Sequence, residues 1–410
     1  MTSASQIPAT AEAPRRAITA TSRETAPVAA PNVPRVWVLV DDRPGSTSQS
    51  TGLAQALGWP FEVKRVRFGA AAVLHNRLLD LRGGSRAAVD APRSSPLTPP
   101  WPDLVIAAGR RLAPVAQWVR KAGGGRPRLV HLGRKGGDDV ERFDLVVTPR
   151  YARLFPHPRR LVISAPLHGI RRERLEAATR LWKPTFERLP GPRIAVLVGG
   201  TSGQYWLDRR GAAEMGRAVA AYAETRGATL MVTTSRRTGA ANTRAFCEAL
   251  PPGSFVHPWN DALPESAVRD AEAENPYLGM LGWADEVIAT GDSESMLAEA
   301  LAAGRPLHIY PLPVRASFPG LRIAREWVRR RADDPATPSP DGRSSRSRRA
   351  IELGWVRPTR DLDTLHAALI ERGLAVRFGD APVAPATDLA AELEAVVTRV
   401  RSLLGEPATP

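Results

Sequence analysis

Residues 277–313 read YLGMLGWADEVIATGDSESMLAEALAAGRPLHIYPLP, and the fold class follows from this stretch. Its apolar run 285–290 predicts a strand, and the run 296–303 predicts a helix that a glycine ends. A second apolar run, 307–311, predicts the next strand. The polar turn 291–295 between strand and helix presents backbone N–H groups, which suit a phosphate. This alternation predicts a parallel sheet that binds its ligand beyond the carboxyl ends of the strands.

The same alternation occurs twice along the chain. A first series begins with the apolar run 35–40, and a second begins with the run 193–198, after the proline-rich join 184–192. Continuous apolar runs are typical of parallel strands that are buried on both faces. We therefore predict an α/β protein with two Rossmann-like doubly wound domains, 34–185 and 190–320, that face a cleft.

Three further segments flank or follow these domains. Residues 1–33 are rich in Ala, Thr and Pro, a composition that predicts a disordered tail. Residues 329–350 are rich in Arg, Ser and Pro and predict a flexible insert, with a nucleic-acid or anionic-lipid contact as the alternative. Residues 351–410 contain two amphipathic helical patterns, which we expect to pack back on the domains.

The charge balance favours anionic partners. The chain has 410 residues, of which 57 are basic and 42 acidic, so its formal charge is +15. Nucleotides, phosphorylated sugars and an anionic membrane surface all suit such a charge, although a genome rich in arginine codons also explains part of the excess. No recognition motif accompanies the charge, so we expect no specific nucleic-acid partner.

Cysteine content and hydropathy limit the class of protein further. The single cysteine, Cys247, excludes a disulfide within the chain, and no Cys/His spacing typical of zinc sites is present. Residues 1–33 lack the apolar core of a secretory signal, and no later run approaches the ~18 apolar residues of a membrane span. We expect a cytoplasmic protein, with peripheral membrane association as an alternative, and we expect no metal site.

Three loops of the second domain follow predicted strand ends. The loop 199–203 is rich in glycine, the loop 234–238 contains two arginines, and the turn 291–295 opens a helix. Loop amides and arginine side chains can bind a phosphate at such a sheet edge. The alternative for each is structural, namely a tight strand–helix turn or a helix cap.

Glu299, in the helix predicted after the turn 291–295, is not at a position that caps this helix. A capping box needs Glu or Gln three residues after the cap, and from Asp292 or Ser293 that position is Ser295 or Met296. Ser295 and Glu299 are four residues apart and share one helix face. Glu299 is therefore a candidate acceptor for ribose hydroxyls, with a solvated helix residue as the alternative.

Polar residues also follow strand ends of the first domain. Asp42 is the candidate general base, because a carboxylate at a strand end in a cleft can deprotonate a hydroxyl group. An Asp/Pro/Gly turn with a helix cap is the equally favoured alternative. The other candidate residues on this acceptor side are Arg43, Gly45, Gln49, Gly109 and Arg110.

Several short motifs together resemble one family. They are Asp42-x-Pro44-Gly45-x-x-x-Gln49, Ala107-Ala108-Gly109-Arg110-Arg111, Val198-Gly199-Gly200-Thr201-Ser202-Gly203, Thr233-Thr234-Ser235-Arg236-Arg237-Thr238, Glu274-Asn275-Pro276-Tyr277 and Thr290-Gly291-Asp292-Ser293-x-Ser295-Met296-x-x-Glu299-Ala300. In this order they resemble the elongate-mitochondria fission-factor family. Plant members of that family lie on the mitochondrial surface and affect fission, whereas bacterial members are often labelled nucleoside-diphosphate-sugar epimerases.

The layout also resembles the two-domain glycosyltransferase fold called GT-B. The resemblance implies that the second domain binds a nucleoside diphosphate-sugar as substrate, without a cofactor. The resemblance assigns this role to the loop 199–203 and to the stretch 291–299. Together with the arginine loop, the candidate residues for nucleotide and phosphate binding are Gly200, Thr201, Ser202, Ser235, Arg236, Arg237, Gly291, Asp292, Ser293, Ser295, Met296 and Glu299. Metal-independent glycosyl transfer is the expected reaction. Epimerisation of the nucleotide sugar, or a non-catalytic adaptor at a membrane surface, is the alternative.

Overall fold

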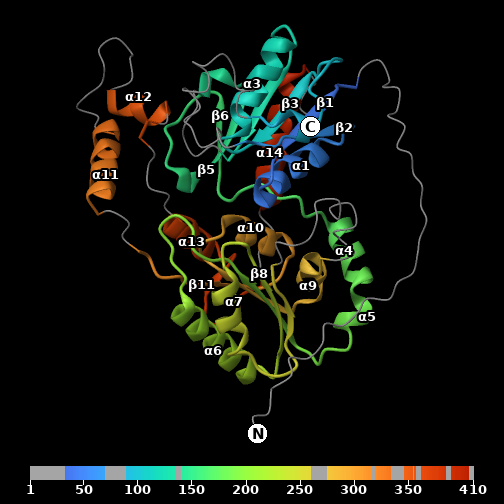
Figure 1. The fold of residues 1–410 in the computed structure, drawn as a ribbon, viewed down its shortest axis with the longest axis vertical. Helices are drawn as coiled ribbons and strands as arrows, with labels where there is room; N and C mark the ends of the chain where they lie inside the picture. The colour runs from blue at the N-terminus through green and yellow to red at the C-terminus, as the bar shows by residue number, and fades with distance from the viewer. Residues whose placement is uncertain are drawn as a thin grey trace. The chain divides into compact units, whose positions relative to one another are not determined.

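The computed structural model describes residues 33–69, 89–133, 140–259, 275–315, 319–333, 346–353, 355–356, 362–384 and 389–405. It contains two six-stranded sheets in which every neighbouring pair of strands is parallel (Figure 1). The predicted fold class, α/β with two Rossmann-like doubly wound sheets, is confirmed. Residues 1–32 of the predicted tail lie outside the described ranges.

The first sheet has the strand order β2-β1-β3-β4-β5-β6. Its strands are β1 (Val36–Val40), β2 (Phe61–Arg65), β3 (Leu104–Ala108), β4 (Arg128–Leu132), β5 (Leu145–Pro149) and β6 (Arg160–Ile163). The helices α1 (Pro44–Leu57) and α3 (Leu112–Ala122) follow β1 and β3. The order reverses between β1 and β3, so the connections from these two neighbouring strands diverge there, as at the ligand sites of doubly wound folds.

Both faces of this sheet are buried, which explains why β1 lacks an alternating pattern. Val36, Val38 and Val40 belong to the core on the α1 side, whereas Trp37 and Leu39 belong to the core on the α3 side. Successive side chains of a strand point to opposite faces. A strand covered on both faces is therefore apolar at every position.

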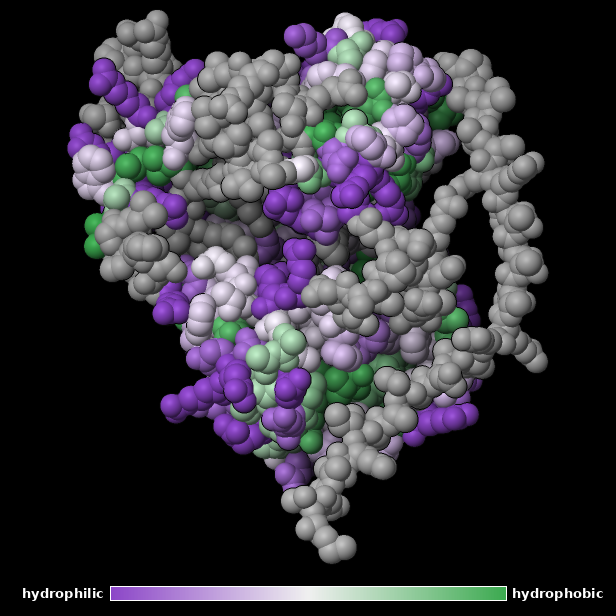
Figure 2. Space-filling model, in the orientation of Figure 1, coloured by the Kyte–Doolittle hydropathy of each residue, from purple (hydrophilic) through white to green (hydrophobic). Residues whose placement is uncertain are grey.

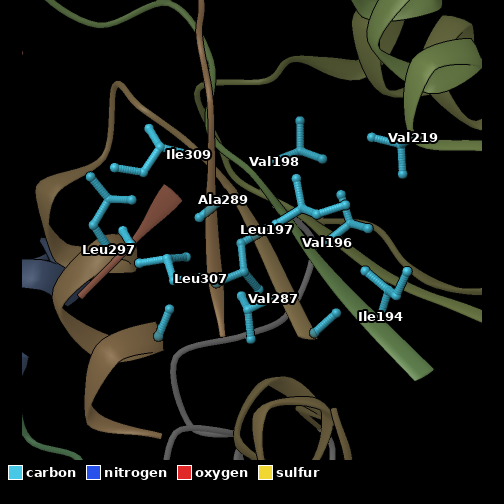
Figure 3. Close-up of a cluster of buried hydrophobic side chains, with 14 of the residues drawn as sticks. Ile194, Val196, Leu197, Val198, Val219, Val287, Ala289, Leu297, Leu307 and Ile309 are labelled. Atoms are coloured by element: carbon cyan, nitrogen blue, oxygen red, sulfur yellow. The ribbon is translucent and has the colours of Figure 1, made fainter. Parts of the chain in front are cut away.

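The second sheet has the strand order β12-β11-β10-β7-β8-β9. Its strands are β7 (Arg193–Val198), β8 (Thr229–Thr234), β9 (Phe255–His257), β10 (Glu286–Thr290), β11 (Leu307–Tyr310) and β12 (Val376–Arg377). Counted within the sheet this is the order 3-2-1-4-5-6 of dinucleotide-binding folds, with its reversal between β7 and β10. Figure 3 shows side chains of β7, β10 and β11 together with Leu297 in its core.

Helices lead into the second sheet and connect its strands. Helices α4 (Arg172–Leu181) and α5 (Lys183–Phe186) lie between β6 of the first sheet and β7. The connecting helices are α6 (Arg209–Thr225), α7 (Ala240–Cys247), α9 (Tyr277–Trp283) and α10 (Glu294–Ala302). Helix α6 begins with Asp208 as N-cap, whose carboxylate accepts a hydrogen bond from Gly211 N at 2.8 Å. Between α6 and α7 the packing is close, because Gly216 has no side chain to separate them.

The last helices return to both sheets. Helix α13 (Leu362–Glu371) buries Leu362, Leu365 and Leu369 in the core of the second sheet. Helix α14 (Leu389–Leu403) packs against α1 and adds Val396, Val397 and Val400 to a core of the first sheet. Each amphipathic helix therefore covers a different sheet.

The segment 329–350, predicted to be a flexible insert, is helical at both of its described ends. Residues 329–333 complete α11 (Pro319–Asp333), and residues 346–350 belong to α12 (Arg346–Glu352), while residues 334–345 lie outside the described ranges. Contacts that the sequence pattern does not reveal hold the two helices. Helix α11 packs against α12, and the buried Arg160 pairs with Glu352 at 2.9 Å.

The close packing of α6 and α7 predicts an unusual effect of alanine at Gly216. In a helix interior, glycine to alanine normally stabilises by about 1 kcal/mol. A Cβ atom at Gly216 would lie 2.6 Å from Phe246 O and 2.9 Å from Ala249 Cβ, so we expect Gly216→Ala to destabilise by about 1–3 kcal/mol. Urea unfolding measures the change. Gly211→Ala in the first turn of the same helix is the control. If Gly216→Ala loses no more stability than this control, the packing argument is contradicted.

Candidate functional site

Predicted site residues of both sheets lie near the two points where strand order reverses, whereas those of the loop 234–238 follow β8. Gly199 and Gly200 follow β7, and Gly291 and Asp292 follow β10, its neighbour in the second sheet. In the first sheet, Asp42 follows β1 and Gly109 follows the neighbouring β3. Because all strands of a sheet point the same way, these loops leave each sheet at its carboxyl edge.

The loops after β7 and β10 are bonded to each other. Gly199 N donates to Thr290 Oγ1 at 2.8 Å, and Gly200 N donates to Asp292 Oδ2 at 3.2 Å. The Thr290 hydroxyl donates in turn to Asp292 Oδ1 at 2.7 Å. The buried carboxylate of Asp292 thus accepts bonds from both loops, and the predicted Gly200 amide is engaged within the protein.

Glycine is required at both positions of the β7 loop for a steric reason. A Cβ atom at Gly199 would lie 2.1 Å from Asp292 Oδ1, and one at Gly200 would lie 2.3 Å from the carbonyl oxygen of Arg237. These distances are far below van der Waals contact. The glycine-rich signal therefore reports the close approach of three loops.

The third loop follows β8 and holds the two predicted arginines. Both arginines are exposed, and Arg237 NH2 contacts Asp292 Oδ2 at 2.8 Å. Ser235 Oγ donates to Gly199 O at 3.0 Å, and Thr238 Oγ1 donates to Val198 O at 3.0 Å. Arg237 is therefore the arginine that the fold orients at the edge of the sheet.

Two predicted residues of the β7 loop have local structural contacts. Thr201 Oγ1 accepts a bond from Leu207 N at 3.2 Å. The backbone of Ser202 pairs with that of Tyr205 in both directions, at 3.1 and 3.0 Å. The hydroxyl of Thr201 thus helps to hold the loop that leads into α6.

The start of α10 has a backbone suited to an anion. Its N-cap, Ser293, makes no side-chain hydrogen bond to the helix. Gly291 O accepts a bond from His366 of α13 at 2.8 Å. Ser295 is half-buried in the first turn, and Met296 packs against the sheet core. The first-turn amides of α10 therefore donate no hydrogen bond to the N-cap side chain.

Glu299 bonds to groups on other helices. Ser48 of α1 donates to Oε1 at 3.0 Å, and Tyr277 of α9 donates its hydroxyl to Oε2 at 2.7 Å. Ser48 Oγ also accepts from Gly169 N at 3.0 Å. Burial raises the pKa of Glu299, and the bonds from Tyr277 and Ser48 partly offset this rise. Glu274, from the same motif as Tyr277, lies outside the described residues.

The two adjacent carboxylates after β1 differ in environment. The side chain of Asp41 is 3% exposed and accepts a bond from Arg43 N at 3.1 Å. Asp42, the predicted base, is 45% exposed and lies 3.6 Å from Arg111 NH1. Burial raises the pKa of Asp41. Raised carboxyl pKa values are typical of general bases and acids, so Asp41 is a second candidate that sequence reasoning missed.

The other predicted acceptor-side residues lie around the start of α1. A Cβ atom at Gly45 would lie 2.6 Å from Ser295 Oγ. Gly109 has a φ of +83°, and a Cβ atom there would lie 3.3 Å from Ser46 Oγ. Gln49 Oε1 lies against Gly133, which follows β4. Arg110 is half-buried between β3 and α3. Gly45 thus places the start of α1 beside the start of α10.

His366, Ser48 and Asp41 are the main residues that sequence reasoning missed. His366 is far from Gly291 in sequence, and Ser48 is far from Glu299, so no local spacing indicates either contact. Asp41 had a usable signal, since it directly follows the buried strand β1. Within the described ranges, no group of three or more His, Cys, Asp or Glu side chains is placed to hold a metal ion.

Comparison with known sequences identifies related proteins. The family model described as Mitochondrial fission ELM1 matches residues 44–325. A mitochondrial fission protein ELM1 of Arabidopsis thaliana is 26% identical over 230 residues, which are 51% of this chain and 51% of the relative. This chain thus spans about half the length of that relative. An uncharacterized protein of Rickettsia prowazekii is 23% identical over 311 residues, which are 68% of this chain and 83% of that protein.

Solved structures that this chain resembles include the following two, both at low identity. UDP-GlcNAc 2-epimerase from Methanocaldococcus jannaschii has a TM-score of 0.45 at 10% identity, over 90% of this chain and 99% of the other. MurG from Acinetobacter baumannii has a TM-score of 0.37 at 13% identity, over 92% and 93%. At these scores and identities the likenesses assign no activity to this chain.

The burial of Glu299 predicts a pH-dependent stability. Because the pKa of Glu299 is raised in the folded protein, the contribution of this residue to the free energy of unfolding is fully present below its pKa in the unfolded chain, ~4.3. That contribution is lost as pH rises through the pKa of the folded state. We therefore expect the free energy of unfolding of wild type, minus that of Glu299→Gln, to fall as pH rises above about 4. Urea unfolding at a series of pH values measures this difference.

A second variant tests the cause of this effect. The Tyr277 hydroxyl lowers the pKa of Glu299, so Tyr277→Phe should move the loss of stability to higher pH. A difference between wild type and Glu299→Gln that stays constant over the whole pH range would refute the argument.

Proposed function

This chain belongs to the Mitochondrial fission ELM1 family, and we propose that it binds a nucleoside diphosphate-sugar at the carboxyl edge of its second sheet. One observation carries the proposal: the first turns of α1 and α10, which follow strands of different sheets, lie side by side. Gly45 approaches Ser295, and one turn further on Ser48 bonds to Glu299. The two helices therefore point their N-terminal ends in the same direction.

Paired helix N-termini favour an anionic ligand. Each N-terminus carries about half a positive charge and unbonded N–H groups. Neither N-cap residue, Arg43 of α1 or Ser293 of α10, makes a side-chain cap bond. A diphosphate supplies both the negative charge and the acceptors that such ends bind.

Arg237 and Trp259 support the same ligand class. Asp292 orients Arg237 through NH2, and an arginine has five N–H donors, so further donors of this guanidinium suit a diphosphate. Trp259 follows β9, is exposed, and donates its backbone N–H to Thr234 at the end of β8. Its indole offers a stacking surface for a nucleobase at the same edge.

Glu299 enters the proposal in a changed role. Its two oxygens accept from Ser48 and Tyr277, so it aligns α1 with α10 and α9. We keep the predicted contact with ribose hydroxyls as part of the proposal, since each carboxylate oxygen has two lone pairs.

The reaction that fits this site best is glycosyl transfer without a metal ion. Arg237 and the helix N-termini would stabilise the diphosphate as it leaves. Asp41 or Asp42, at the reversal point of the first sheet, would accept the proton of an acceptor hydroxyl. Epimerisation of the sugar is the second candidate reaction, because it needs the same diphosphate contacts. An adaptor without turnover is the third.

Donor binding is tested by calorimetry with nucleoside diphosphates and UDP-, GDP- and dTDP-linked sugars. We expect one donor class to bind, and Arg237→Gln to weaken it by at least about tenfold, because a charged hydrogen bond contributes roughly 1.5–3 kcal/mol. Arg217→Gln, an exposed arginine of α6, removes the same charge and should leave binding unchanged. If none of these donors binds to the folded wild-type protein, the proposal is wrong.

Product analysis distinguishes the three activities. Transfer yields free nucleoside diphosphate only with an acceptor, epimerisation yields a new nucleotide sugar without one, and an adaptor yields neither. In a transferase we expect Asp41→Asn or Asp42→Asn to abolish turnover while donor binding persists, and the variant that does so identifies the base. Full turnover in both variants would exclude a base at the end of β1.

A further inference from the structure

Helix α11 presents hydrophobic side chains outward. Ile323 is 68% exposed and Trp327 is 56% exposed. They are four residues apart, so they lie on one face of the helix. The guanidinium of Arg331 lies over the Trp327 ring at 4.7 Å, and the helical spacing places the exposed Arg330 beside the same stripe. We call Ile323, Trp327, Arg330 and Arg331 the α11 outer face.

Polar contacts hold the opposite side of α11 and its partner α12. Glu326 pairs with Arg153, with two N–O distances of 3.3 Å. The guanidinium groups of Arg329 of α11 and Arg348 of α12 both lie against the Phe155 ring, at 4.9 and 4.7 Å from its centroid. An ordinary surface helix turns its apolar stripe inward and its charges to water. Here the ionic contacts point inward and Trp327 points outward.

This arrangement calls for a partner that is apolar inside and anionic at its surface. Trp is enriched at membrane–water interfaces, where its ring lies at the level of the headgroups. Amphipathic helices that lie in the interface combine such residues with arginines, which anionic lipids attract. In Figure 2 the region of α11 and α12 carries hydrophobic residues among hydrophilic ones.

We propose that the α11 outer face is a docking surface for an anionic lipid bilayer. The formal charge of +15 complements such a surface. Nucleic acid fits less well, because phosphate contacts make no use of an exposed aliphatic side chain such as Ile323. Within the described ranges no helix is long and apolar enough to cross a bilayer, so the contact we propose is superficial.

The test is sedimentation of the full chain with vesicles of phosphatidylcholine, alone or mixed with phosphatidylglycerol. We expect binding to the mixed vesicles that weakens with added salt. Ile323→Ser with Trp327→Ser should weaken binding by at least about tenfold, because the apolar contact is lost. Arg330→Gln with Arg331→Gln should weaken it about fivefold for each arginine.

Matched changes on α4 serve as controls. Leu181→Ser removes an exposed apolar side chain, and Arg172→Gln with Arg180→Gln removes the same charge as the arginine pair. Neither control should change vesicle binding. Circular dichroism checks that each variant folds, and if the Ile323/Trp327 pair does not fold, the arginine pair decides.

Three outcomes would overturn the proposal. The first is that folded wild type does not bind the mixed vesicles. The second is that the α11 variants bind like the α4 controls. The third is that substitution of Trp327 and Ile323 changes self-association, measured by light scattering, or binding of a nucleic-acid duplex, measured by gel shift, while the protein does not bind vesicles. The third result would assign the surface to a second copy of the chain or to nucleic acid.

Discussion

Strand direction is the constraint on which the rest of this structure depends. Every neighbouring pair in both sheets is parallel, so each strand needs a crossover and each strand–helix loop leaves at the carboxyl edge. The strand order reverses between β1 and β3 in one sheet and between β7 and β10 in the other. At those points the connections diverge, and polar loop residues that are far apart in sequence lie close together.

The polar groups of these buried loops need hydrogen-bond partners within the protein. Asp292 is one such partner, since it accepts hydrogen bonds from Gly200, Thr290 and Arg237. A buried carboxylate is costly unless it is bonded in this way, so Asp292 orders the loops at the same edge that is proposed to bind a diphosphate. Arg237 neutralises Asp292, and in the proposed function its remaining donors bind the diphosphate.

The link between α1 and α10 depends on residues that are each unremarkable in sequence. Gly45 permits the close approach, Ser48 supplies a hydroxyl, and Glu299 accepts it. Burial of Glu299 is tolerated because two hydroxyl groups donate to it. The same carboxylate therefore joins helices that belong to different sheets.

The sequence by itself determined the alternation of strands and helices and both parallel sheets, but not the helices α11 and α12. Continuous apolar runs such as 193–198 and the glycine stops between them depend only on local chemistry. It also located the loops after β7, β8 and β10, because strand ends are visible as a change from apolar to polar residues. Only the tertiary structure decided the partner of each side chain. Glu299 meets Ser48, and Gly291 meets His366, across long stretches of chain, and Asp41 differs from Asp42 in burial and in its partners. Such contacts follow from how whole elements pack, which no local pattern encodes.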